Sequence, residues 1–282
     1  MAPETRPLIS VDELATLRAN PGLVVLDARW TLGQTDGSSH FLAGHIPGAR
    51  FVDLDTELAS PPSPRRGRHP LPSRENFQDT LRMLGVTRDS TIVAYDQAES
   101  FSAARLWWLL RNAGFEAARV LDGGLRAWTE AGYPVSIGEP DAVTPSEITI
   151  EWDRVPSIEI DDAASFPGRG ILLDARAGER YRGEIEPMDP RAGHIPGALS
   201  APTTENLDDT GAFLPAEQLR TRFANLDIGP STPIAVYCGS GITASHQILA
   251  LEVAGFTGTL FPGSWSQWAS DPARSAATGA TP

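Results

Sequence analysis

The chain has few residues that could form a disulfide or hold a metal ion. It contains one cysteine, Cys238, and five histidines in 282 residues. A single cysteine excludes disulfides within the chain and any zinc site that needs several thiolates. The histidines lack the close spacing of metal ligands, so we expect no metal and no other cofactor. A chain without disulfides is compatible with a reducing compartment, and we expect a cytoplasmic location.

Long apolar runs and a positive net charge are also missing. No run approaches the ~18 apolar residues of a membrane helix, and residues 1–6 lack the apolar core of a signal peptide. With 23 basic and 36 acidic residues, the formal net charge is −13. Such a protein repels phosphates, so neither nucleic acid nor a membrane surface is expected as a partner. An anionic substrate would need a local cationic pocket.

The sequence contains one series of motifs twice, in the same order. The repeated segments are 24–29 with 171–176, 44–49 with 193–198, 92–96 with 234–238, and 113–115 with 254–256. The second pair, GHIPGA, is identical in both halves. Such ordered matches predict two homologous domains. We expect the first over residues 1–135, a linker rich in turn-forming residues over 136–147, and the second over 148–282.

Each half alternates short apolar segments with helical stretches. In the first half, strands are expected at 23–27 and 91–95, and helices at 74–84 and 102–113. This alternation favours an α/β fold with a mainly parallel sheet covered by helices on both faces. Ligands bind such sheets beyond the carboxyl ends of the strands. Cys238 occupies such an end in the second half.

The residues around Cys238 favour a reactive thiol. Residues 233–237 predict a buried strand, and 239–244 (GSGITA) predict a tight turn that leads into a helix. This order places the sulfur among backbone N–H groups, which favour a thiolate. A lone cysteine can also be a small buried hydrophobic residue, but packing alone does not need flanking glycines. Asp96 stands in the repeated position and cannot carry sulfur, so we expect a catalytically silent first domain.

Together these motifs resemble the two-domain sulfurtransferases of the rhodanese superfamily. The resemblance rests on a GHIPGA segment in each half, a cysteine loop in the second only, and the segments 174–176, 180–183 and 263–265. It implies two tandem rhodanese-like domains, each a mainly parallel five-stranded sheet flanked by helices. It also implies a Cys238 persulfide that passes sulfur from a small-molecule donor to an acceptor. That acceptor would be a thiol, a thioredoxin-like protein or cyanide.

The cysteine loop bears on the donor. Residues 238–244 read CGSGITA, which is similar to the members that use 3-mercaptopyruvate, with Ile242 in place of valine. Members that use thiosulfate have basic residues directly after the cysteine. A thiosulfate:cyanide sulfurtransferase and a persulfide carrier with little turnover stay open as alternatives. Ala244 stands where rhodanese-like phosphatases have an arginine that binds phosphate, which argues against a phosphatase.

The resemblance also implies residues that bind the substrate. Arg180 matches the family's substrate arginine, although it could instead form a surface ion pair with Glu184 or Glu186. The identity of a second substrate arginine stays open, because Asp189 occupies the position at which the family has that arginine. Arg191 is the first choice and Arg182 the second. Backbone N–H groups would hold the transferred sulfur at Gly239, Gly241, Ile242 and Thr243. Thr243 could alternatively just cap the helix.

Ser240, His69 and Asp55 match a proposed Ser–His–Asp relay of the 3-mercaptopyruvate branch. Such a relay could protonate the enolate of pyruvate as it leaves. His69 lies in an insertion at 60–70 with three arginines, which form either a solvated loop or an anion-binding mouth. His69 could also simply bind backbone there. The residues that occur in both halves are interpreted as structural: Asp27, Arg29, His45, Asp174, Arg176 and His194.

Overall fold

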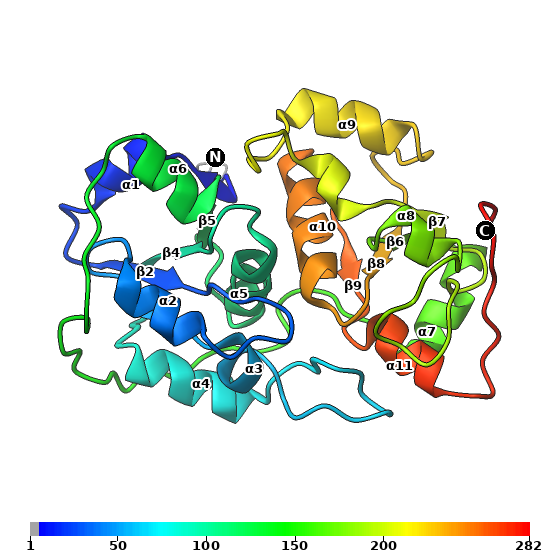
Figure 1. Ribbon diagram of the computed structural model, residues 1–282, viewed down its shortest axis with the longest axis horizontal. Helices are drawn as coiled ribbons and strands as arrows, with labels where there is room; N and C mark the ends of the chain where they lie inside the picture. The colour runs from blue at the N-terminus through cyan, green and yellow to red at the C-terminus, as the bar shows by residue number, and fades with distance from the viewer. Residues whose placement is uncertain (1–5) are drawn as a thin grey trace. The chain divides into compact units, whose positions relative to one another are not determined.

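The computed structural model describes residues 6–282, which divide into two compact units (Figure 1). The first unit comprises the described residues up to Ser60, with Pro72–Val155 and Asp209–Ala212. The second comprises Pro61–Leu71, Pro156–Asp208 and Phe213–Pro282. Residues 1–5, which entered the argument against a signal peptide, lie outside the described residues.

This division differs from the boundaries expected from the repeat. The chain enters the second unit at Pro156, whereas the repeat placed the start of the second domain at residue 148. The segment Pro61–Leu71, which the sequence placed in the first half, packs with the second unit. His69 therefore belongs to the same unit as Cys238.

The first unit contains a five-stranded parallel sheet with the strand order β1-β5-β4-β2-β3. The strands are β1 (Leu8–Ile9), β2 (Leu23–Asp27), β3 (Arg50–Phe51), β4 (Thr91–Tyr95) and β5 (Arg119–Leu121). The helices are α1 (Val11–Leu17), α2 (Gly37–Ala43), α3 (Leu54–Glu57), α4 (Arg74–Met83), α5 (Phe101–Asn112) and α6 (Gly124–Glu130). The predicted strands at 23–27 and 91–95 are confirmed, and the two predicted helices agree to within one residue. The last four residues of both β2 and β4 are buried, as expected for the inner strands of a parallel sheet.

The second unit repeats this sheet with the order β7-β6-β8-β9. Its strands are β6 (Ile171–Asp174), β7 (Leu199–Ser200), β8 (Ile234–Tyr237) and β9 (Thr259–Leu260). Its helices are α7 (Ile160–Ser165), α8 (Gly178–Tyr181), α9 (Ala216–Ala224), α10 (Ile242–Val253) and α11 (Ser264–Ser270), with 3-10 turns at η1 (Phe166–Gly168) and η2 (Thr203–Asn206). Four strands are formed here where five were expected. In the place of the fifth, Ser157 makes one isolated parallel bridge to Leu260, which is too short for a strand.

The helices of the described part are short. The longest, α5 and α10, have 12 residues each. Within residues 6–282, no helix is long and apolar enough to span a bilayer. Most residues of α10 are buried, so this helix packs inside its unit with its first turn directly after the end of β8.

A buried ion pair closes the carboxyl end of each sheet. Asp27 ends β2 and binds Arg29 at 2.8 Å, and Asp174 ends β6 and binds Arg176 at 2.6 Å. Both arginines also donate to the carbonyl of the first glycine of a GHIPGA segment, at 2.8 and 2.6 Å. These contacts fasten the repeated segment to the sheet, which supports the structural interpretation of both pairs.

The two repeated histidines serve the same segments. His45 contacts the carbonyl of Phe41 through Nδ1 at 2.9 Å, and His194 contacts that of Tyr181 at 2.8 Å. Each imidazole also stacks on the ring of that partner, with centroids 3.9 and 3.7 Å apart. These contacts support the interpretation of both residues as structural.

Removing the cation of one pair should destabilise the protein. Arg29→Met would leave the Asp27 carboxylate buried without its charge partner, since Asp27 has no exposed surface. We expect a loss of about 3–5 kcal/mol in the free energy of unfolding, measured by urea denaturation. The matched control is Arg220→Met on the exposed side of α9, which should change little. Equal stability of the two variants would contradict this account.

Candidate active site

Cys238 lies between the end of β8 and the start of α10. Gly241 ends this turn at φ +85°, a left-handed conformation that glycine adopts without steric cost. The Cys238 side chain is buried, and its Sγ accepts a hydrogen bond from the Gly241 N–H at 3.1 Å. Its own N–H donates to Ser264 Oγ at 3.1 Å. The sulfur is thus held at the N-terminus of α10, where N–H groups of the first turn lack carbonyl partners within the helix.

The first unit has a corresponding turn, one residue longer, that holds a different anion. The Asp96 carboxylate accepts N–H groups from residues of the loop and of the first turn of α5, at 2.9–3.2 Å: Ala98, Ser100, Ser102 and Ala103. Ser100 occupies the position of Gly241 and also has a positive φ, +61°. These four N–H groups form a cradle for an anion, and the carboxylate of Asp96 itself occupies it. They are therefore not available to a transferred sulfur.

The structure brings Ser240 and His69 together. Ser240 Oγ lies 2.8 Å from His69 Nδ1, and both side chains are buried. The loop that carries His69 is fastened to α11, because the Arg68 N–H donates to Ser266 Oγ at 3.0 Å and Gln267 donates to the Arg65 carbonyl at 2.7 Å. This loop therefore places the imidazole beside the hydroxyl that follows Cys238 by two residues.

Asp55, the third predicted member of the relay, lies on α3 in the first unit. Its carboxylate accepts a hydrogen bond from the indole N–H of Trp30 at 3.0 Å. A role for Asp55 in orienting His69 stays a prediction from the resemblance.

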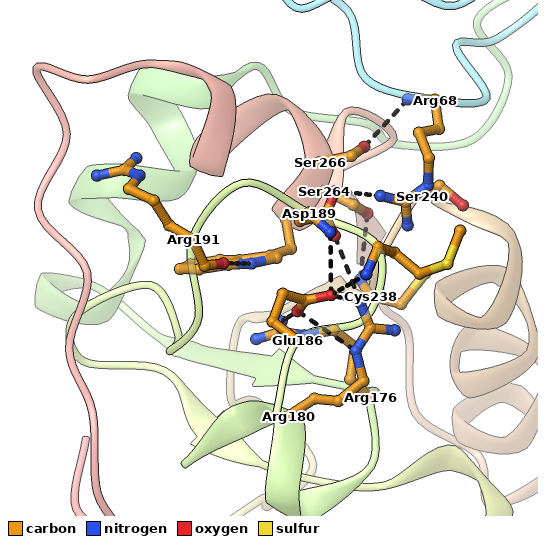
Figure 2. A network of polar contacts seen from close by, with 12 residues as sticks. Arg68, Arg176, Arg180, Glu186, Asp189, Arg191, Cys238, Ser240, Ser264 and Ser266 are labelled. Atoms are coloured by element: carbon orange, nitrogen blue, oxygen red, sulfur yellow. Dashed lines mark hydrogen bonds and ion pairs between the residues drawn. The ribbon is translucent and has the colours of Figure 1, made fainter. Parts of the chain in front are cut away.

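Arg180 lies beside the cysteine loop, as Figure 2 shows. A methyl group placed on Gly239 would be 3.6 Å from Arg180 Nη1. The guanidinium also binds Glu186 at 2.6 Å and Asp189 at 3.4 Å. Of the two predicted ion pairs, the one with Glu186 is formed, and it holds Arg180 against the loop.

Arg191 and Arg182 are engaged elsewhere. The Arg191 guanidinium donates at 2.6–2.9 Å to four backbone carbonyls around the end of α11, those of Trp268, Ala269, Asp271 and Arg274. In Figure 2 it points away from Cys238. Arg182 pairs with Glu184 at 2.7 Å on the surface. The structure therefore does not bring Arg191, the first choice for a second substrate arginine, to the cysteine loop.

Arg68 is the arginine at the loop that sequence reasoning did not single out. Its Nη2 would lie 2.9 Å from a methyl group on Gly239, and its Nη1 binds the Asp189 carboxylate. The sequence leaves open whether the three arginines of residues 60–70 form an anion-binding mouth, and Arg68 is the one that the structure places against Gly239. Hydrogen bonds between loop 61–71 and α11 make that choice.

The charged groups at the loop balance one another. Three arginines (Arg68, Arg176 and Arg180) alternate with three carboxylates (Asp174, Glu186 and Asp189) in one network. Burial raises the pKa of Asp189 above its usual range, against the opposing effect of Arg68. Among residues 6–282, no group of three or more His, Cys, Asp or Glu side chains could hold a metal ion. The cationic groups of this network are the guanidinium groups of its three arginines.

Asp96→Asn tests whether burial or the N–H donors have the larger effect on the pKa of Asp96. Burial raises the pKa of Asp96 above its usual 3.8. A carboxyl group whose pKa is higher in the folded than in the unfolded state binds its proton more tightly when the protein is folded. Its contribution to the free energy of unfolding is therefore lost as the pH rises from the unfolded-state pKa through the folded-state pKa. In urea unfolding from about pH 3.5 to about pH 7, the wild type should therefore lose free energy of unfolding relative to the variant. A gain by the wild type would mean that the N–H donors outweigh burial.

Comparison with known proteins covers nearly the whole chain. The rhodanese-like domain family matches twice, over residues 10–131 and 159–271. A Pseudomonas aeruginosa protein, provisionally named a 3-mercaptopyruvate sulfurtransferase, is 44% identical over 281 residues, which cover 96% of this chain and 98% of the relative. A Mycobacterium tuberculosis protein, provisionally named thiosulfate sulfurtransferase SseB, is 42% identical over 95% of both chains.

A solved structure agrees with this assignment. The crystal structure of Escherichia coli SseA, described as a 3-mercaptopyruvate sulfotransferase, has a TM-score of 0.82 and 33% identity. The match covers 93% of this chain and 99% of SseA. The resemblance drawn from the motifs is confirmed, and the chain belongs to the rhodanese family, with two rhodanese-like domains.

Proposed function

We propose that the protein is a sulfurtransferase that moves sulfane sulfur from 3-mercaptopyruvate to a thiophilic acceptor through a persulfide on Cys238. The observation that carries this proposal is the position of Cys238 Sγ, which accepts the Gly241 N–H at the N-terminus of α10. A thiolate is stabilised by such N–H groups and is the nucleophilic form of cysteine. The provisional name of the Pseudomonas aeruginosa relative and the description of SseA support this donor.

The first step transfers sulfur to Cys238. The Cys238 thiolate attacks the sulfur of the donor, an S–S bond forms, and the donor's C–S bond breaks with its electron pair left on carbon. The products are the Cys238 persulfide and the enolate of pyruvate. N–H groups of the loop and first turn (Gly239, Gly241, Ile242 and Thr243) would hold the terminal sulfur without a side-chain charge.

Ser240 and His69 would deliver a proton to the enolate that leaves in this step. An enolate is a strong base and needs a proton to become pyruvate, and the proton of the donor thiol can reach it through a hydroxyl relay. Ser240 Oγ, 2.8 Å from His69 Nδ1, supports such a relay. Thiosulfate, by contrast, releases sulfite, a stable anion that needs no proton to leave. The hydrogen bond therefore favours 3-mercaptopyruvate over thiosulfate as the donor.

Arg180 would bind the donor's carboxylate, because the planar guanidinium fork suits a carboxylate and lies against the loop. The persulfide would then be attacked by the acceptor, whether a small thiol, a thioredoxin-like protein or cyanide, which restores the Cys238 thiolate. The first unit would stay catalytically silent, with Asp96 in its cradle. A cytoplasmic location is part of the same proposal.

A thiosulfate:cyanide sulfurtransferase is the second candidate. The provisional name of the Mycobacterium tuberculosis relative favours it. Both candidates use the same persulfide, so only a comparison of the two donors separates them.

Cys238→Ser should abolish sulfur transfer. Incubation of the wild type with 3-mercaptopyruvate and no acceptor should add the mass of one sulfur atom, and the variant should show no such gain in mass spectrometry. Turnover to thiocyanate with cyanide as acceptor should disappear with both donors. Because Cys238 is the only cysteine, no other thiol can replace it. Activity that survives in the variant would disprove the mechanism, and a wild type without turnover on either donor would disprove the function.

Ser240→Ala should lower kcat with 3-mercaptopyruvate by about 10²–10⁴ and affect thiosulfate far less, as expected for loss of a general acid. Ser240 and His69 act as one unit here, so Ser240→Ala/His69→Asn should be no worse than the single variants. Steady-state kinetics with both donors measures this, with the exposed Ser231→Ala as the matched control. An equal loss with both donors would contradict a proton-relay role.

A further inference from the structure

The cysteine loop lies between two guanidinium groups from different parts of the chain. Arg180 comes from α8 and Arg68 from the loop at Pro61–Leu71, yet both would be within 3.6 Å of a methyl group on Gly239. Any larger residue at Gly239 would displace Arg68, whose Nη2 would be 2.9 Å away. The missing side chain is what lets both cations approach the backbone next to Cys238.

Arg68 retains capacity to bind a ligand. A guanidinium has five N–H donors. Arg68 uses Nη1 on Asp189, whereas its buried Nε has no hydrogen-bond partner among the described residues. Its side chain is 23% exposed, so the group is partly open to solvent while its position is fixed. The chain contains no lysine, so each strong cation is a guanidinium of this kind.

Asp189 joins the two arginines. Its Oδ1 binds Arg68 and its Oδ2 lies 3.4 Å from Arg180, while its side chain is only 3% exposed. Its N–H, like that of Met188, donates to Glu186, at 3.2 Å. This carboxylate is therefore held by contacts on both of its oxygens, between Arg68 and Arg180 (Figure 2). It positions both guanidinium groups and also subtracts one positive charge from them.

We infer that Arg68 and Asp189 form a pair that selects the sulfur donor by its charge. Arg68 supplies, opposite Arg180, the second guanidinium for the donor's anionic group. Asp189 is the carboxylate of the network that contacts both guanidinium groups, so its charge repels a dianion such as thiosulfate more strongly than a monocarboxylate such as 3-mercaptopyruvate. This inference rests on the proposed function, since it assigns a donor preference to the same site.

The test compares kcat/KM for 3-mercaptopyruvate and thiosulfate, with cyanide as acceptor, in the wild type and four variants. Asp189→Asn keeps the size of the side chain and removes its charge. We expect it to raise the ratio of thiosulfate to 3-mercaptopyruvate kcat/KM by about tenfold, the scale of one nearby charge in a partly exposed site. Arg68→Met should raise KM for both donors, and more for the dianion, with a smaller effect on kcat.

Arg66→Met is the matched control, because Arg66 lies on the same loop, is exposed and donates to the Leu71 carbonyl. It should leave both kcat/KM values unchanged. The double variant Arg68→Met/Asp189→Asn should return the donor ratio toward that of the wild type. A shift in ratio cannot come from partial unfolding, which lowers both activities together, so the result can be interpreted even if a variant is less stable.

Two outcomes would overturn the inference. One is a donor ratio that Asp189→Asn leaves unchanged, and the other is an Arg68→Met variant with wild-type KM for both donors. In either case a wild type that still turns over 3-mercaptopyruvate would leave the proposed function intact. A wild type that turns over neither donor would instead remove the function itself and the donor selection with it.

Discussion

The buried pair between Asp174 and Arg176 is the interaction on which the second unit depends. Arg176 is 1% exposed and contacts four parts of the chain: the end of β6 through Asp174, the GHIPGA carbonyl, Glu186 at 3.2 Å, and the ring of Trp265, 4.6 Å from its guanidinium carbon. A buried charge is tolerable only when it is fully paired, so each of these partners is held in place. Through Glu186 the same arginine fixes the acidic segment that positions Arg180.

Two tyrosines beside this pair, Tyr181 and Tyr237, have pKa values raised by burial and by the charge of Asp174. Burial beside Asp174 raises the pKa of Tyr237 well above its usual value, and burial raises that of Tyr181 to about 12. Both phenols therefore stay protonated at neutral pH. Tyr237 accepts the Ile195 N–H at 3.1 Å, and Tyr181 donates to the Ala198 carbonyl at 2.7 Å. They hold the middle and the end of the GHIPGA segment without adding charge next to the candidate active site.

The two units show how one N–H cradle can have two uses. In the first, Asp96 carries its own charge into the cradle, and in the second the cradle holds the sulfur of Cys238. Neither the turn nor the helix needs a thiol in order to form, because the unit with aspartate folds in the same way. Packing alone therefore does not require a cysteine at position 238. The cationic side chains beside this loop, Arg68 and Arg180, come from other segments of the unit.

The sequence by itself determined the repeat, the alternation of strands and helices, and the place of Cys238 between a strand and a helix, and its family resemblance pointed to Arg180, which lies beside the cysteine loop. These follow from local patterns, since apolar runs and glycine turns are set by neighbours in the chain. Which arginine joins Arg180 was decided only by the tertiary structure. Asp189 and Arg191 lie close in sequence, but Arg191 caps α11, whereas Arg68 reaches the loop from 171 positions before Gly239. No spacing rule encodes this, because the contact depends on which unit the loop at Pro61–Leu71 packs against.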